Sequence, residues 1–276
     1  MANLILCDID GTLIRRGHGF SASTAEAMAR LRAQGHYIAL ASGRNLWSCR
    51  QIIPEELPVS HWLFSTGVGV WDVAGKCVLR RRELTALESR RIAEVLESIQ
   101  ADYMVLAPLE DCPRFVYRRF GRLENACTDF DKRLAEYAGM SRLLAEGEES
   151  RLATACQFLI FLPSGDARLE RLRDCLADDF TFVHSNSPYG GTTVWAEVFS
   201  RAAGKARAGE WLASQPDLDI TATYALGNDF NDLDMLRWAD HAMVTPNAPA
   251  ALQAMFPVTQ ADTDGAFAEA VQRWGM

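Results

Sequence analysis

The apolar residues in the first third of the chain alternate between strand-like and helix-like patterns. Three uninterrupted apolar runs of strand length lie at 4–6, 37–41 and 62–64. Such runs, without polar alternation, are typical of parallel strands that are covered on both faces. Residues 23–26 (Ser-Thr-Ala-Glu) have the pattern of a capping box and predict a helix that continues to Leu31. This order of elements favours a doubly wound parallel sheet.

The pattern changes between residues 83 and 189. Helix-like stretches now alternate with short apolar runs, and the spacing suits an α+β insert better than further parallel βα units. The helices are expected at 85–99, 123–137 and 166–176, and the strands near 104–106, 115–117 and 157–161.

Beyond residue 190 the α/β pattern resumes. Strands are expected at 193–195, 220–226 and 241–244, with helices at 205–212 and 231–238. The sequence therefore predicts a discontinuous Rossmann-like α/β core, formed by residues 1–82 and 190–276, that is interrupted by an α+β cap domain at 83–189.

Composition narrows the class of protein. The 276 residues include 28 Lys and Arg and 36 Asp and Glu, which gives a net charge of −8 and argues against nucleic acid as the main partner. The seven cysteines form no Cys-x-x-Cys pair, which indicates a reducing compartment, the cytoplasm, rather than a zinc or disulfide framework. No apolar run approaches the length of about 20 residues that spans a membrane, and the first residues lack the pattern of a signal peptide.

The strongest chemical signal is the sequence Asp-Ile-Asp-Gly-Thr at the end of the first strand. Asp8 and Asp10 lie where ligands bind in open α/β sheets, and Gly11 allows a sharp turn. Two neighbouring carboxylates repel each other unless a cation or a shared proton intervenes, and oxygen ligands suit Mg²⁺. The alternative is an ordinary turn after a strand.

A second signal follows the strand at 37–41. Ser42, Gly43 and Arg44 combine a hydroxyl, a glycine with accessible N–H groups and a guanidinium, which together make an anion cradle. The alternative is a strand-to-helix loop in which Ser42 caps the helix.

Two further signals lie near the C-terminal end. The segment 227–232 (Gly-Asn-Asp-Phe-Asn-Asp) places several oxygen ligands after a predicted strand, where they could complete a metal site or simply form a turn and helix cap. Lys205 opens a predicted helix, although a lone lysine is most often a solvated surface residue.

Taken in order, these four motifs resemble those of the haloacid dehalogenase superfamily, and in particular its Cof-like branch with a large cap. The resemblance covers nearly the whole chain. It implies that Asp8 is the nucleophile that becomes an aspartyl phosphate, and that Asp10 is the general acid and then the general base. It also implies a phosphate site and a Mg²⁺ site. The phosphate would be bound by Ser42, Gly43, Lys205 and Asn231, and the metal by Asp8, the Asp10 main chain, Asn228, Asp229 and Asp232.

The chain departs from the superfamily pattern at two places. The final motif usually begins Gly-Asp, whereas this chain has Asn228 followed by Asp229, so either residue could be the metal ligand. The loop after the third strand, commonly Asn-Gly-Ala, reads Thr66-Gly67-Val68 here, and it is expected to contact substrate or cap.

Basic residues of the insert are candidates for contacts with the substrate. Arg114, Arg118 and Arg119 could meet a second anionic group on the substrate or could form a solvated basic face. The segment 189–192, which ends at Thr192, could be a flexible substrate loop or a plain hairpin turn.

The resemblance implies a Mg²⁺-dependent phosphatase that acts on a small phosphorylated metabolite such as a sugar phosphate. A phosphomutase that uses the same core is an alternative. A receiver-like signalling module, in which a phosphorylated Asp changes conformation, is a remote one, because receiver domains are shorter and lack a large insert.

Overall fold

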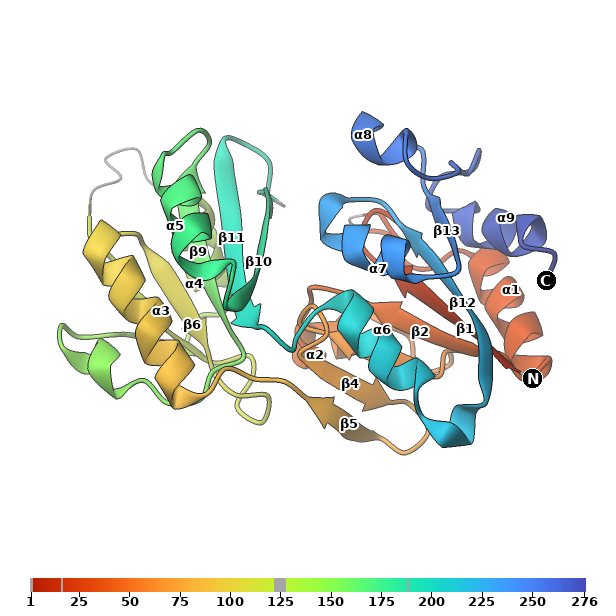
Figure 1. Ribbon diagram of the computed structural model, residues 1–276, viewed down its shortest axis with the longest axis horizontal. Helices are drawn as coiled ribbons and strands as arrows, with labels where there is room; N and C mark the ends of the chain where they lie inside the picture. Colours follow the sequence, from red (N-terminus) through yellow and green to blue (C-terminus); the bar gives the residue numbers. More distant parts are fainter. Residues whose placement is uncertain (1, 16, 122–127, 188) are drawn as a thin grey trace. The chain divides into compact units, whose positions relative to one another are not determined.

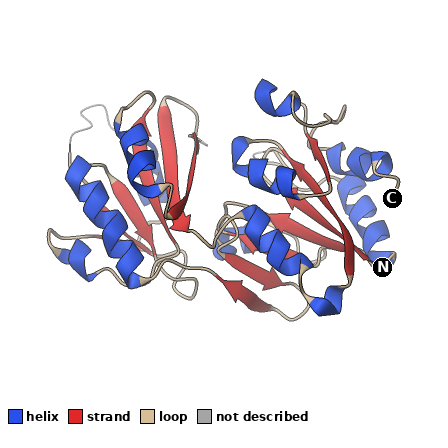
Figure 2. Cartoon of the chain, viewed as in Figure 1, coloured by secondary structure: helices blue, strands red, loops and turns tan. Residues whose placement is uncertain are grey.

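The computed structural model describes residues 2–15, 17–121, 128–187 and 189–276 (Figures 1 and 2). The chain divides into two compact units. The first unit consists of Met1–Arg81 and Gly204–Met276, and the second of the contiguous segment Arg82–Ala203. The first unit is thus interrupted by the second in sequence.

The first unit is built on a seven-stranded sheet in the order β13-β12-β1-β2-β3-β4-β5. The five strands from β13 to β3 are parallel, and β4 and β5 extend the sheet as antiparallel strands. The strands are β1 (Ala2–Asp8), β2 (Tyr37–Ala41), β3 (His61–Phe64), β4 (Gly69–Asp72), β5 (Cys77–Arg81), β12 (Ile220–Gly227) and β13 (His241–Val244). The helices are α1 (Ala22–Ala33), α2 (Leu46–Ile52), α6 (Lys205–Ala213), α7 (Leu233–Trp238), α8 (Ala250–Gln253) and α9 (Ala266–Arg273), with short 3₁₀ turns at Pro216–Leu218 and Phe230–Asp232.

The central strand of this sheet is covered on both faces. Leu4 and Leu6 of β1 pack into an apolar cluster with Leu212 of α6 and Met235 of α7. Ile5, whose side chain points to the opposite face, is also fully buried. Burial on both faces explains why β1 is an uninterrupted apolar run, as expected for a central parallel strand.

The second unit contains a six-stranded, mainly antiparallel sheet in the order β10-β11-β9-β6-β7-β8. Its strands are β6 (Tyr103–Leu106), β7 (Phe115–Arg118), β8 (Ser141–Leu143), β9 (Gln157–Pro163), β10 (Phe180–Asn186) and β11 (Thr193–Ser200), and its helices are α3 (Ala86–Ile99), α4 (Thr128–Glu136) and α5 (Arg168–Leu176), with a 3₁₀ turn at Glu148–Arg151. Helices α3 and α5 pack on one face through a large apolar cluster that includes Ile160. Phe130 of α4 packs edge-on against Phe161, the next residue of β9, so α4 covers the opposite face.

Two details differ from the expectations. The chain returns to the first unit at Gly204 rather than at residue 190, because Thr193–Ser200 pairs with β9 and β10 in the second sheet. In α1 the capping residue is Ser21, whose side chain accepts a hydrogen bond from the Thr24 amide, and not Ser23. The N-terminal part of the helix expected at 123–137 lies outside the described residues.

No helix in the described part of the chain is long and apolar enough to cross a membrane.

Candidate active site

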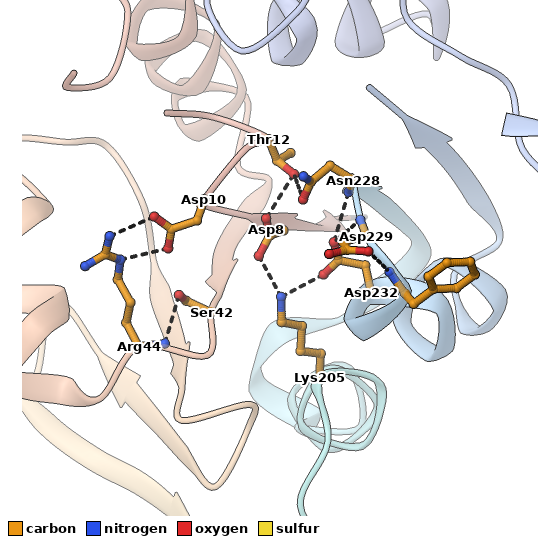
Figure 3. Close-up of polar contacts among 10 residues, drawn as sticks. Asp8, Asp10, Thr12, Ser42, Arg44, Lys205, Asn228, Asp229 and Asp232 are labelled. Carbon is orange, nitrogen blue, oxygen red and sulfur yellow. Dashed lines mark hydrogen bonds and ion pairs between the residues drawn. The ribbon is translucent and has the colours of Figure 1, made fainter. Parts of the chain in front are cut away.

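The motif residues of the first unit meet at one edge of its sheet (Figure 3). Strands β12, β1 and β2 are neighbours and run parallel, with Cys7 paired to Leu226 and Asp8 to Ala41. Because the carboxyl ends of parallel strands lie at the same edge, the loops that follow these three strands converge. The sequence analysis placed each of these motifs directly after a predicted strand.

The centre of the site is a buried ion-paired triad. Nζ of Lys205 donates to Oδ1 of Asp8 at 2.6 Å and to Oδ1 of Asp232 at 2.7 Å. The side chains of Lys205, Asp8 and Asp232 are only 1%, 6% and 0% exposed. The lysine is therefore not a solvated surface residue. When both carboxylates are ionised, the triad carries one net negative charge in a dry environment, where further positive charge is favourable.

The environment changes the acid–base properties of this triad. Burial, reinforced by the nearby Asp232 carboxylate, raises the pKa of Asp8 to about 7, although Lys205 opposes the shift. Burial alone would lower the pKa of Lys205, but the Asp232 and Asp8 carboxylates outweigh it, so that the pKa of Lys205 is raised and the side chain stays charged.

Asp10 is held apart from the triad by Arg44. The guanidinium donates from Nε to Oδ2 and from Nη2 to Oδ1 of Asp10, both at 2.7 Å. Such bidentate pairing fixes the orientation of a carboxylate as well as its position. The arginine is itself anchored, because its Nη1 donates to Ser48 Oγ at 3.0 Å and its carbonyl accepts from the Ser65 amide at 2.7 Å. Asp10 remains about half exposed and accessible to solvent.

The loop after β2 is tied to the turn after β3. The main-chain oxygen of Ser42 accepts from the Thr66 amide at 2.9 Å, while Ser42 Oγ accepts from the amide of Arg44 at 3.1 Å. Ser42 does not cap α2, because Asn45 does so. Gly43, one residue after Ser42, is half-buried in the same loop.

The turn at residues 65–67 connects this loop to the start of α6. Ser65, Thr66 and Gly67 all have positive φ values, of 48°, 53° and 79°. A Cβ at Gly67 would lie 2.3 Å from the carbonyl oxygen of Gly204, directly before Lys205. Only glycine fits this close approach, so the turn that was expected to contact substrate or cap also supports the buried lysine.

A set of oxygen atoms suited to a cation lies beside Asp8. One terminal atom of the Asn228 amide is 3.2 Å from Asp8 Oδ2 and 3.2 Å from the main-chain oxygen of Asp10. If this atom is nitrogen, it donates to both neighbours. If it is oxygen, three acceptor oxygens face one another, which is the arrangement that a hard cation stabilises. The donor set therefore fits Mg²⁺, even though no cluster of three or more Asp, Glu, His or Cys capable of holding a metal occurs among the described residues.

The other acidic residues of the final motif have different partners. Asp229 accepts from the Phe230 amide at 2.7 Å and so caps the turn. Asp232 Oδ2 accepts from the amides of Asn228 and Asp229 at 2.9 and 3.2 Å, while its Oδ1 pairs with Lys205. Both carboxylates are thus engaged, and the geometry favours Asn228 over Asp229 and Asp232 as a metal ligand. Oδ1 of Asn231 is buried without a hydrogen-bond partner among the described residues.

The remaining candidates lie in the second unit. Arg118 pairs with Glu97 at 3.2 Å, and Arg119 pairs with Asp131 at 2.7 Å. Thr192 lies in the turn between β10 and β11, which are antiparallel, so its segment is a hairpin connection. Arg114 is exposed and borders a cavity of the second unit.

Two contributing residues were missed by the sequence reasoning. Thr12 Oγ1 lies 3.0 Å from Asp8 Oδ2 and can donate to it; its place in the Asp-x-Asp-Gly-Thr motif was the available signal. Asn247 donates to the carbonyl oxygen of Gly11 at 3.0 Å, and it follows β13 in a loop that carries no motif.

Comparison with known proteins shows the family of this chain. A family model for haloacid dehalogenase-like hydrolases matches residues 5–271. A protein of Bacillus subtilis (strain 168), YkrA, which is named provisionally as a phosphatase, is 27% identical over 285 residues, covering 100% of this chain and 98% of its own.

Solved structures show the same fold. The phosphatase BT1666 from Bacteroides thetaiotaomicron matches with a TM-score of 0.78 at 18% identity, over 100% of this chain and 96% of that one. The HAD subclass IIB sugar phosphatase BT4131 matches with a TM-score of 0.73 at 17% identity, over 99% of both chains. The predicted α/β fold class is thereby confirmed. Since the family model spans almost the entire sequence, the protein belongs to the haloacid dehalogenase-like hydrolases, the superfamily that its motifs predict.

Proposed function

We propose that the protein is a Mg²⁺-dependent phosphatase that hydrolyses a small phosphorylated metabolite through an aspartyl phosphate on Asp8. The observation that carries this proposal is the buried triad in which Lys205 joins Asp8 to Asp232. A carboxylate held at a strand end beside a permanently charged lysine is suited to meet a phosphate dianion, because the ammonium offsets the repulsion between the two anions.

The proposed reaction has two steps. A carboxylate oxygen of Asp8 attacks phosphorus, the bond from phosphorus to the ester oxygen breaks, and Asp10 donates a proton to the departing oxygen. Water then attacks the phosphorus of the aspartyl phosphate while Asp10 accepts a proton, and this step releases inorganic phosphate and restores the Asp8 carboxylate. Lys205, the Ser42–Gly43 loop and the side-chain N–H donors of Asn231 are proposed to bind the transferring phosphoryl group.

The ion pair between Arg44 and Asp10 affects the first step of the proposed reaction. In the structure both carboxylate oxygens of Asp10 accept hydrogen bonds from Arg44 at the edge of the site. Asp10 must release at least one of these bonds to donate a proton to the leaving oxygen. Arg44, which the sequence analysis placed in an anion cradle, would in this mechanism position the general acid.

The metal would be held by the Asp8 carboxylate, the Asp10 main-chain oxygen and the Asn228 amide oxygen. When bound, Mg²⁺ neutralises charge between the Asp8 carboxylate and the phosphoryl oxygens and polarises the latter. The 3.2 Å spacing of the Asn228 amide from both other donors supports this assignment. With Asn in place of a carboxylate, the site has one negative charge fewer, and we expect weaker binding of Mg²⁺.

A sugar phosphate is the substrate class that we favour. It is suggested by the structural neighbour BT4131, which is a sugar phosphatase. We also propose substrate contacts from Arg114, Arg118 and Thr192. To contact the substrate, Arg118 would have to break its ion pair with Glu97.

The test compares wild type with Asp8→Asn and Asp10→Asn. Hydrolysis of p-nitrophenyl phosphate is expected to require Mg²⁺ and to be abolished in Asp8→Asn. Asp174→Asn, an exposed change on α5, is the matched control and should be fully active. A panel of sugar phosphates would then rank the substrates, and analysis for an isomerised product would separate a phosphatase from a phosphomutase.

The Asp10→Asn variant tests the intermediate. Without its general base, we expect acid-quenched samples to contain phosphate covalently bound to the protein after incubation with a labelled substrate. Full activity of Asp8→Asn, or labelling that survives in the Asp8→Asn/Asp10→Asn double variant, would refute Asp8 as the nucleophile.

A further inference from the structure

A cavity of about 560 Å³ lies within the second unit. It opens between the ends of β6, β7 and β8 and the segment that leads from the 3₁₀ turn at Glu148–Arg151 to β9. Its volume falls in the range of about 300–1,000 Å³ that is typical of small-molecule sites. All of its lining residues belong to Arg82–Ala203, so it is a property of that unit alone.

The interior of the cavity is apolar. Its walls include Leu106 at the end of β6, Phe115 at the start of β7, and Leu144 and Leu152 from the adjoining segments. Each of these side chains is at most 9% exposed. A ligand that enters this space would exchange water for contact with aliphatic and aromatic carbon, which favours an apolar molecular body.

The rim of the cavity is cationic. Three exposed arginines, Arg114, Arg142 and Arg151, line it together with a single acidic residue, Glu148. That acid is already paired with Arg142 at 2.7 Å. Within the described ranges, neither Arg114 nor Arg151 forms an ion pair with a carboxylate. The lining therefore carries a net charge of 3 − 1 = +2 on a chain whose net charge is −8.

We propose that this cavity binds an amphipathic organic anion, with an apolar body against the walls and a carboxylate, phosphate or sulfonate head group between Arg114 and Arg151. Guanidinium groups bind planar or tetrahedral oxyanions through paired N–H donors. Arg114 and Arg151, which form no ion pair with a carboxylate in the described part of the chain, both line this apolar space. Of the residues proposed to contact the phosphatase substrate, only Arg114 lines the cavity, and the inference does not depend on the phosphatase activity.

Three probes separate the contributions to binding. Anilinonaphthalene sulfonate combines an aromatic body with an anionic head, phenylnaphthylamine has the same rings without the sulfonate, and inorganic phosphate has the charge without the body. Fluorescence titration of the native protein should show saturable one-to-one binding of the sulfonate. Phenylnaphthylamine should bind about tenfold or more weakly, because it lacks the charge-assisted contacts. Phosphate alone, even in excess, should displace little of the bound sulfonate.

Variants locate the site. Arg114→Glu/Arg151→Glu should weaken binding of the sulfonate at least about tenfold while binding of phenylnaphthylamine stays unchanged. The matched control, Arg90→Glu/Arg171→Glu, makes the same charge change on α3 and α5 outside the cavity and should leave binding unaltered. Ala153→Phe, at an exposed lining position, should block the cavity without altering its charge.

Hydrogen exchange supplies an independent measure. Protection by the sulfonate should be confined to residues 105–116 and 139–155. Three results would overturn the proposal. One is sulfonate binding that neither the charge reversal nor Ala153→Phe changes. The others are equal affinity for the two dyes, and protection of residues outside these two segments. A fold defect is detected by the near-ultraviolet circular dichroism of each variant, and Ala153→Phe keeps the test valid if the double reversal does not fold.

Discussion

Replacing Lys205 by Met removes the only cation of the buried triad and leaves its two carboxylates unpaired. The Asp8 and Asp232 side chains are 6% and 0% exposed, and each lies within 2.7 Å of the ammonium. Removing one partner of a buried ion pair costs about 3–5 kcal/mol. Methionine has a similar volume and flexibility, so little of this loss would arise from a cavity. A destabilisation of that size corresponds to a change of roughly 10²–10⁴ in the unfolding equilibrium.

Urea unfolding followed by tryptophan fluorescence measures the effect, and Lys76→Met, an exposed lysine in the same unit, is the control. Adding Asp232→Asn to Lys205→Met should restore part of the lost stability, because the amide keeps an acceptor oxygen for the two main-chain donors while removing one charge. A loss of less than about 1 kcal/mol in Lys205→Met, or further destabilisation on adding Asp232→Asn, would refute the account based on uncompensated buried charge.

Three further predictions concern other parts of the first unit. Asn228→Asp should tighten Mg²⁺ binding several-fold in isothermal titration calorimetry, because it adds a carboxylate to the oxygen set, and unchanged affinity would remove Asn228 from the metal site. The burial of His61 lowers its pKa to about 4; the Asp72 carboxylate opposes this shift and the Arg32 guanidinium adds to it. The neutral imidazole therefore contributes stability above pH 6.5, and this contribution is lost as the pH falls toward 4. Up to about 3 kcal/mol of stability should disappear across that range in wild type, and denaturant titrations should show a smaller loss in His61→Phe. Gly67→Ala should destabilise the protein by at least about 1–2 kcal/mol in thermal unfolding, through its positive φ and the 2.3 Å approach of a backbone oxygen, whereas an unaffected melting temperature would show that the turn relaxes.

The strands that carry the motifs were predictable because burial on both faces leaves a clear mark in sequence. Each run of apolar residues in β1, β2 and β12 ends at the motif, and parallel strands bring such ends together. The family and the fold class, both predicted from this order, are confirmed by the comparisons.

The partners of individual polar groups were not predictable in the same way. Asp229 and Asp232 are both acids in one short loop, yet one caps a turn and the other binds Lys205. The choice depends on where the chain places the lysine, which comes from a different helix. The boundary at which the chain returns to the first unit was wrong for a related reason. Thr193–Ser200 has the composition of a strand from either unit, and its antiparallel pairing with β9 is what assigns it to the second unit.

The position of β1 between β2 and β12 has a consequence for synthesis on the ribosome. Strand β2, the neighbour of β1 on one side, is synthesised soon after β1. Strand β12 and Asp232 emerge only after the whole second unit has been translated. The second unit, being contiguous, has all of its strands available before the first unit has its own. A nascent or truncated chain that ends before Asp232 therefore contains Asp8, the proposed nucleophile, but lacks part of the charge network around it. On the proposed mechanism, hydrolytic activity begins only late in translation.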